Sequence, residues 1–317
     1  MRIGCPWAFR GEPRSIEEMK TFSYRLLDVF TNVPFGGNPL AVFTDARGLT
    51  DAMMQSIARE LNLSETTFVL PARDRLHHYW VRIFTPLAEL PAGGHPTIGT
   101  AYALALEERL RQEAAKQRVV FEEQTGPISV TMEAPMLTMQ QPLPTFGPVY
   151  GERDAIAAML GLEPTALPSG MPVQSVSCGV PYLLVPVTDL ETMQRIRFRL
   201  DIWERVLRRS AHPHVFVFTL QCRYDGSSAH CRMFAPSLGV HEDPATATAA
   251  GPLVGYFAKW GILGAEPKLT FVCEQGIEIG RPSFIHVTVE HNGEDITSLR
   301  VGGQCVAVGL GQIQLEG

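Results

Sequence analysis

The chain has 317 residues, of which 45% are hydrophobic and 19% are charged, and its formal net charge is −6. This length exceeds the roughly 250–300 residues at which a single hydrophobic core stops growing, so two domains are expected. The acidic balance and the lack of a Lys/Arg cluster argue against nucleic acid or an anionic membrane surface as a partner. Small molecules are therefore the expected ligands.

The six cysteines are scattered and include no C-x-x-C pair, so neither a zinc site nor a compact disulfide framework is indicated. No apolar run approaches the roughly 20 residues that cross a bilayer, and the N-terminus lacks the apolar stretch of a signal peptide. We therefore expect a cytoplasmic protein. Residues 1–18 mix prolines and charges without a period, and we expect an extension outside the fold, with an ordered arm as the alternative.

In the first half, hydrophobic alternation and turn residues predict strands at 24–30, 40–43, 64–70, 80–84, 119–121 and 128–132. A helix is expected between Thr50, a candidate N-cap, and Asn62. A second helix opens at Pro96 and continues to Leu110. It is apolar nearly all round, so it should be buried in a core.

The segment 140–148 contains three prolines and a glycine and is the best linker candidate. We place a domain boundary there, which gives a first lobe of 19–146 and a second lobe of 147–317. The last strand is a candidate to cross back to the first lobe. Helices are predicted at 154–160 and 202–207, and strands at 173–177, 182–187, 215–218, 229–234, 269–273, 277–279, 284–289 and 306–308.

The run from Ala245 to Trp260 is helical in composition but is interrupted by Gly251 and Pro252. Either its first turns are irregular, or the helix starts at Pro252. Each half thus has one strongly apolar helix among more numerous strands. This pattern predicts an α+β fold in which a sheet curls round a helix.

An R-x-F-x-P pattern occurs at 82–86 and again 150 residues later at 232–236. Each copy is followed by a polar residue before proline, first His95 and then Asp243. We infer two similar halves, each of which delivers one helix N-terminus to a shared site.

His95 follows two glycines and precedes a proline, so it is expected at a helix N-terminus, where it could bind an anion or exchange a proton. A helix cap is the plainer interpretation. Capping alone also accounts for Asp243. Glu65 starts a strand, where a carboxylate is usually solvated. A Ser64 nucleophile, a thiolate base and a nucleotide-binding loop are all disfavoured, because none of their sequence patterns is present.

Four stretches together resemble the phenazine-biosynthesis isomerase (PhzF-like) family: 37–42, 62–69, the series 82–86, 89–91 and 94–96, and 242–246. Residues 280–283 also fit, and the resemblance extends from Met19 to the C-terminus. It implies a fold similar to diaminopimelate epimerase, with two pseudo-symmetric lobes, each a curled, mostly antiparallel sheet around a central helix. It also implies an active site in the cleft between the lobes, a homodimer, and no metal or organic cofactor.

The resemblance implies an isomerase that moves a proton on a small carboxylate, of the trans-2,3-dihydro-3-hydroxyanthranilate isomerase type. Glu65 would be the general acid/base, with His95 and Asp243 as catalytic partners. The expected substrate contacts are Gly94, Pro96, Thr97, Ala247 and Thr248.

Two departures from the family pattern fall in the expected pocket. Ala247 stands where glycine is usual, and the loop 92–94 lacks a common phenylalanine. They leave open a binding protein of the same fold without catalysis. An amino-acid racemase or epimerase is a third alternative. It is disfavoured because Gly94 and the 247–248 region occupy the positions of the paired cysteines.

Overall fold

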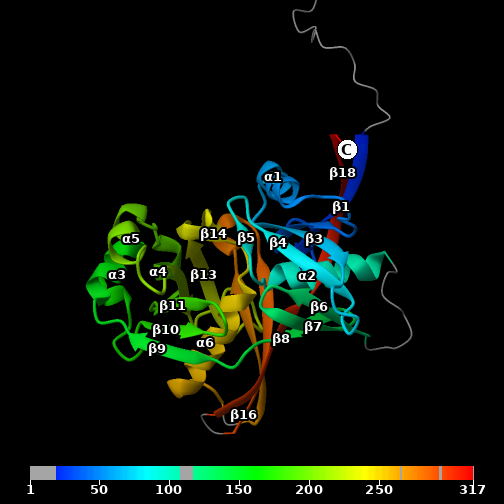
Figure 1. Cartoon of the computed structure of the whole chain (residues 1–317). Helices are drawn as coiled ribbons and strands as arrows, with labels where there is room; N and C mark the ends of the chain where they lie inside the picture. Colours follow the sequence, from blue (N-terminus) through cyan, green and yellow to red (C-terminus); the bar gives the residue numbers. More distant parts are fainter. Residues whose placement is uncertain (1–18, 108–116, 265, 293–294, 317) are drawn as a thin grey trace, which may run out of the picture.

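The computed structural model describes residues 19–107, 117–264, 266–292 and 295–316. The fold is α+β, as predicted, with a large mixed sheet and few helices (Figure 1). The residues expected to form the N-terminal extension lie outside the described part, as does the predicted helical segment 108–110. Within the described ranges, no helix is long and apolar enough to span a membrane.

The first half contains β1 (Met19–Val29), β2 (Asn38–Phe43), α1 (Asp51–Leu61), β3 (Glu65–Pro71), β4 (Tyr79–Phe84), β5 (Glu89–Leu90), α2 (His95–Leu106), β6 (Gln117–Glu123), β7 (Gly126–Glu133) and β8 (Met136–Gln140). The predicted N-cap of α1 and the predicted end of the helix at Asn62 are confirmed. Thr50 accepts a hydrogen bond from Met53 N at 3.3 Å, and Asn62 ends the helix in the left-handed conformation.

The second half contains β9 (Thr145–Val149), α3 (Arg153–Leu160), β10 (Gln174–Ser177), β11 (Pro181–Pro186), α4 (Leu190–Arg195), α5 (Leu200–Val206), β12 (His214–Thr219), β13 (Ala229–Ala235), β14 (Val240–Asp243), α6 (Ala247–Lys259), β15 (Lys268–Gln275), β16 (Ser283–Asn292), β17 (Asp295–Gly303) and β18 (Cys305–Glu316). The strand predicted at 277–279 is instead a 3-10 turn, because Gly276 and Gly280 on either side of it adopt positive φ.

The two halves repeat one succession of strand pairings. The pairs β2–β3 and β4–β6 are parallel, as are their counterparts β11–β12 and β13–β15. The hairpins β6–β7 and β15–β16 correspond in the same way. Strand β18 pairs with β1 in the first half, and β9 pairs with β10 in the second half in the same way. The pairing of β8 with β17 joins the two halves. The predicted boundary at 146–147 falls inside β9 and stays a prediction.

One apolar helix lies against the strands of each half, α2 in the first and α6 in the second (Figure 1). Nine of the twelve residues of α2 are buried, as the apolar circumference predicts. A glycine on each helix permits close approach. A Cβ on Gly99 would lie 2.5 Å from Leu40 Cδ2, and one on Gly251 would lie 1.9 Å from Gln141 Oε1.

Both interpretations of the second apolar run are wrong. Helix α6 begins at Ala247 and continues through Pro252, which lies in its interior. Proline removes one backbone donor and normally costs about 3 kcal/mol in a helix interior. Burial of the residues from Ala249 to Ala258 opposes that cost, since apolar area removed from water contributes about 25 cal/mol per Å².

Candidate active site

A cavity of about 220 Å³ is lined by residues from both halves of the chain. Glu65 enters it from the start of β3, and residues 90–96, which run from β5 into the first turn of α2, line another side. The second half contributes Tyr182, His214 and the segment that leads into α6. Apolar side chains complete the wall, namely Leu90, Val180, Met233, Leu238 and Val240.

The N-termini of α2 and α6 meet at this cavity. A Cβ on Gly94 would lie 2.7 Å from the Cβ of Ala247 and 3.2 Å from the backbone nitrogen of Thr248. Helix N-termini carry a partial positive charge and unpaired N–H groups, so their convergence favours an anionic group. The lack of a side chain at Gly94 is what allows the two backbones to approach.

Glu65 and His95 form the central contact. The carboxylate Oε2 lies 3.0 Å from the imidazole Nε2, and the side chains are 13% and 6% exposed. Burial lowers the pKa of His95, but the nearby carboxylates of Glu65 and Asp243 outweigh it, and the net pKa is raised. The imidazole is therefore poised to carry positive charge close to the Glu65 carboxylate.

Asp243 lies at the end of β14, where it accepts hydrogen bonds from Asn38 Nδ2 at 2.8 Å and Thr246 Oγ1 at 2.5 Å. Burial and the neighbouring Glu65 raise its pKa to about 6, while the positive charge of His95 and the two hydrogen bonds oppose the rise. Asn38 also lies 3.2 Å from His95 Nδ1. One amide thus links the aspartate to the histidine.

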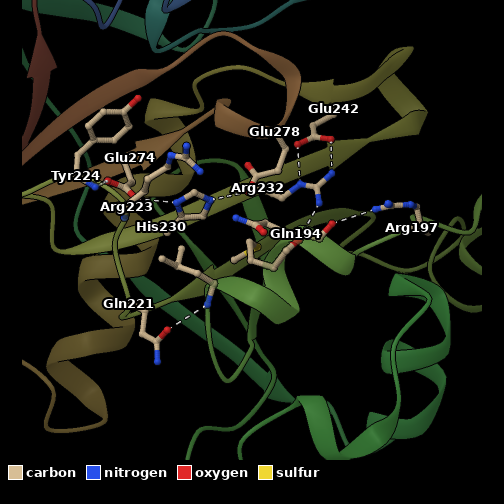
Figure 2. A network of polar contacts seen from close by, with 12 residues as sticks. Gln194, Arg197, Gln221, Arg223, Tyr224, His230, Arg232, Glu242, Glu274 and Glu278 are labelled. Carbon is tan, nitrogen blue, oxygen red and sulfur yellow. Dashed lines mark hydrogen bonds and ion pairs between the residues drawn. The ribbon is translucent and has the colours of Figure 1, made fainter.

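Two side chains of strand β13, Arg232 and His230, make polar contacts with glutamates of neighbouring segments (Figure 2). Arg232 donates two hydrogen bonds, at 2.8 and 2.7 Å, to the carboxylate of Glu242, the residue before Asp243. His230 lies between Glu274, 2.7 Å from Nδ1, and Glu278, 2.9 Å from Nε2. Next to Glu274, Gln275 donates to the backbone oxygen of Asp243 at 2.7 Å.

The chain matches the family model described as phenazine biosynthesis-like protein over residues 27–311. It belongs to that family. It is 37% identical over 308 residues to an uncharacterized isomerase of Mesorhizobium japonicum, covering 93% of this chain and 99% of the relative. It is 35% identical over 301 residues to the trans-2,3-dihydro-3-hydroxyanthranilate isomerase of Pseudomonas fluorescens, covering 92% and 99%.

Its structure resembles that of a Bacillus anthracis phenazine biosynthesis protein of the PhzF family. The TM-score is 0.85 at 28% sequence identity, and the match covers 93% of this chain and all of the other. The family assignment inferred from the four sequence stretches is thereby confirmed, and the chain is an isomerase of this phenazine biosynthesis-like family.

The predicted site residues of this isomerase come together, with two differences. Glu65, Gly94, His95, Pro96, Asp243, Ala247 and Thr248 all line the cavity, so Glu65 is not a solvated strand-end carboxylate. Thr97 does not line the cavity, because its hydroxyl contacts the backbone oxygen of Gly93 and the carboxyl group of Glu123 instead. Asp243 is not the helix cap, because α6 starts only at Ala247, after the cap residue Thr246.

Several polar residues of the site are missing from the sequence-based prediction. Tyr182 Oη lies 2.6 Å from Thr248 Oγ1, and burial raises the pKa of this tyrosine. His214 starts β12, the counterpart of the strand that Glu65 starts, and burial lowers its pKa. The internal repeat could have identified His214. In the second half Tyr182 of β11 pairs with His214 of β12, as Leu40 of β2 pairs with Glu65 of β3 in the first half.

The described residues contain no cluster of three or more His, Cys, Asp or Glu side chains that could hold a metal ion. None of the described residues that line the cavity is a cysteine. The polar groups available to a substrate are therefore carboxylates, imidazoles, hydroxyls and backbone N–H groups.

Proposed function

We propose that this protein is a cofactor-independent isomerase that moves a proton between two carbons of a small carboxylate, with Glu65 as the general acid/base. The contact of Glu65 with His95 inside a largely apolar cavity carries this proposal. The named activity of the Pseudomonas fluorescens relative supports trans-2,3-dihydro-3-hydroxyanthranilate as the substrate type.

The proposed reaction starts when the Glu65 carboxylate removes a proton from a C–H bond of the substrate. The electron pair that remains moves into the substrate's π system, and the proton returns from Glu65 to a different carbon. No electron leaves the substrate, so no oxidant or reductant is required. Positioned proton transfer of this kind typically contributes a rate factor of about 10²–10⁴.

The N-termini of α2 and α6 would bind the substrate carboxylate and stabilise the negative charge that develops. The N–H groups around Gly94 and Thr248 converge there, and apolar side chains form much of the remaining wall. His95 would then keep the Glu65 carboxylate oriented, and Asp243 would in turn support His95. We place this site between the two lobes, each of which supplies one helix.

The experiment is deuterium uptake into trans-2,3-dihydro-3-hydroxyanthranilate in heavy water. Glu65→Gln keeps the size of the side chain but removes the base, so uptake should fall to background while the unfolding curve stays close to that of the wild type. The matched control is Glu60→Gln, at an exposed carboxylate on α1, which should keep full exchange. Wild-type exchange by Glu65→Gln would contradict the proposal.

The methyl group of Ala247 favours one alternative. It occupies the space between the two helix N-termini and narrows the expected anion site. A binding protein without catalysis would bind small carboxylates by calorimetry, yet exchange no proton in the wild type. We also infer a homodimer from the family resemblance, which sedimentation equilibrium tests directly.

A further inference from the structure

A buried carboxyl group contacts the first turn of α2, the helix that begins with His95. Glu123 is the last residue of β6 and is only 3% exposed. It does not line the cavity, so it has no contact with a substrate there. Its Oε1 lies 2.5 Å from the hydroxyl of Thr97, in the first turn of α2.

The Thr97 hydroxyl has two close oxygen neighbours, Glu123 Oε1 at 2.5 Å and the backbone oxygen of Gly93 at 2.6 Å. A threonine hydroxyl has one hydrogen to donate. With an ionised Glu123, one of these two contacts would be an oxygen pair with no hydrogen between them. With a proton on Glu123 Oε1, the acid donates to Thr97 and Thr97 donates to Gly93, so both contacts are satisfied.

The charged groups around Glu123 do not compensate a negative charge. On α2, His95 is engaged with Glu65. Glu123 also lines a neighbouring hollow, in which Arg73, the backbone of Asp74 and His77 bind the carboxylate of Glu122 instead. Arg75 lines the same hollow. Among the described residues, none of these groups forms an ion pair with Glu123.

The electrostatics agree with this geometry. Burial raises the pKa of Glu123 to about 7, against the lowering effect of its bonds with Thr97 and the backbone of Gly93. Because the folded-state pKa exceeds the usual value of a glutamate, the neutral form is the one that the fold favours.

We propose that Glu123 acts as a neutral carboxylic acid and is a positioning residue, whose proton holds the turn from Gly93 to Thr97, and with it His95, in the catalytic arrangement. Its effect on the reaction rests on the proposed function, whereas its protonation state does not. Loss of the proton leaves one of the two contacts of the Thr97 hydroxyl, to Glu123 or to Gly93 O, without a hydrogen. The turn must then shift, and activity must fall above about pH 7.

The variant Glu123→Gln tests this role because its side-chain NH₂ donates to Thr97 at every pH. The wild type should lose kcat/KM about tenfold per pH unit above its alkaline midpoint, as expected for one essential proton. The variant should keep its activity through this range, because it has no carboxyl proton to lose at this position. The matched control is Glu122→Gln, at the adjacent carboxylate of β6. Its kcat/KM should fall at alkaline pH in the same way as that of the wild type.

A second measurement requires no substrate, and it does not depend on whether the Glu123→Gln variant folds. With glutamate labelled at the δ carbon, carbon-13 NMR of the Glu65→Gln variant should show one carboxyl signal titrating near pH 7. The amide signals of Gly93 and Gly94 should follow the same midpoint. The proposal would be overturned if every glutamate carboxyl signal were that of the ionised form at pH 6. It would also be overturned if kcat/KM of Glu123→Gln fell at alkaline pH as it does in the wild type.

Failure of the proposed function has a different signature. In that case Glu65→Gln retains proton exchange, while the Glu123 titration and the shift of the Gly93 amide are still observed.

Discussion

The side-chain amide of Asn38 donates a hydrogen bond to Asp243 at 2.8 Å, although the two residues are 205 positions apart in the chain. The same nitrogen donates to the backbone oxygen of Ala245 at 3.1 Å and contacts His95. A single residue at the start of β2 therefore fixes the carboxylate, the approach to α6 and the imidazole relative to one another.

Replacement of this amide should impair the reaction more than the fold. Asn38→Leu removes one of the two buried donors of the Asp243 carboxylate, which keeps Thr246, and the side-chain donor to Ala245 O. A loss of about 1–3 kcal/mol in holding the site corresponds to a roughly fivefold to 150-fold loss of kcat/KM. Deuterium exchange measures the loss. The exposed neighbour Asn32 supplies the control Asn32→Leu, and equal effects of the two variants would refute a specific role for Asn38.

The ion pair of Arg281 with Asp28 should contribute to stability. Arg281 lies 2.5 Å from the Asp28 carboxylate, which is 3% exposed, and it also donates to the backbone oxygens of Gly36 and Gly37. Arg281→Met leaves a buried charge uncompensated, so unfolding in urea should become easier by about 3 kcal/mol.

The double variant separates charge from packing. If the loss arises from the isolated carboxylate, Asp28→Asn combined with Arg281→Met should recover much of the stability. Additive losses in the double variant would point to packing of the loop instead.

The stability of the fold should depend on the protonation of His230. Hydrogen bonds and charge from Glu274 and Glu278 outweigh the effect of burial and raise its pKa to about 9. The folded-state value exceeds the unfolded value of about 6.5, so the stabilisation is complete below about pH 6.5 and is lost as the pH rises towards 9.

Urea denaturation at several pH values measures this dependence. The free energy of unfolding should decline from pH 6.5 to 9 in the wild type, and the decline should be smaller in His230→Gln. His241→Gln, at an exposed histidine, should retain the wild-type slope. An identical slope in all three proteins would exclude His230 as the source.

The contact of α2 with the sheet should not tolerate an added methyl group. A Cβ at Gly99 would lie 2.5 Å from Leu40 Cδ2 and 2.8 Å from Val29 Cγ2. Gly99→Ala should therefore destabilise the protein by about 1–3 kcal/mol in thermal or urea unfolding. A Cβ at Gly151 would meet no heavy atom within 4 Å, so the control Gly151→Ala should be close to neutral.

Local sequence patterns were sufficient for most elements. Thr50 and Asn62 mark the ends of α1 because capping depends on neighbouring residues in the chain. The pattern failed at Pro252, where tertiary burial keeps a helix intact through a residue that disfavours it locally. It also failed at 277–279, where two glycines with positive φ override the apolar alternation.

The sequence by itself determined the α+β class, the two apolar helices, the repeat and the family, because each rests on local periodicity or on short ordered motifs. Only the tertiary structure decided how the polar groups of the site contact one another. The contacts of Asn38 with Asp243, Glu65 with His95 and Glu123 with Thr97 join residues from separate elements, and no local pattern encodes their distances. Burial then shifts their protonation, since desolvation depends on the packing of the whole chain rather than on sequence neighbours.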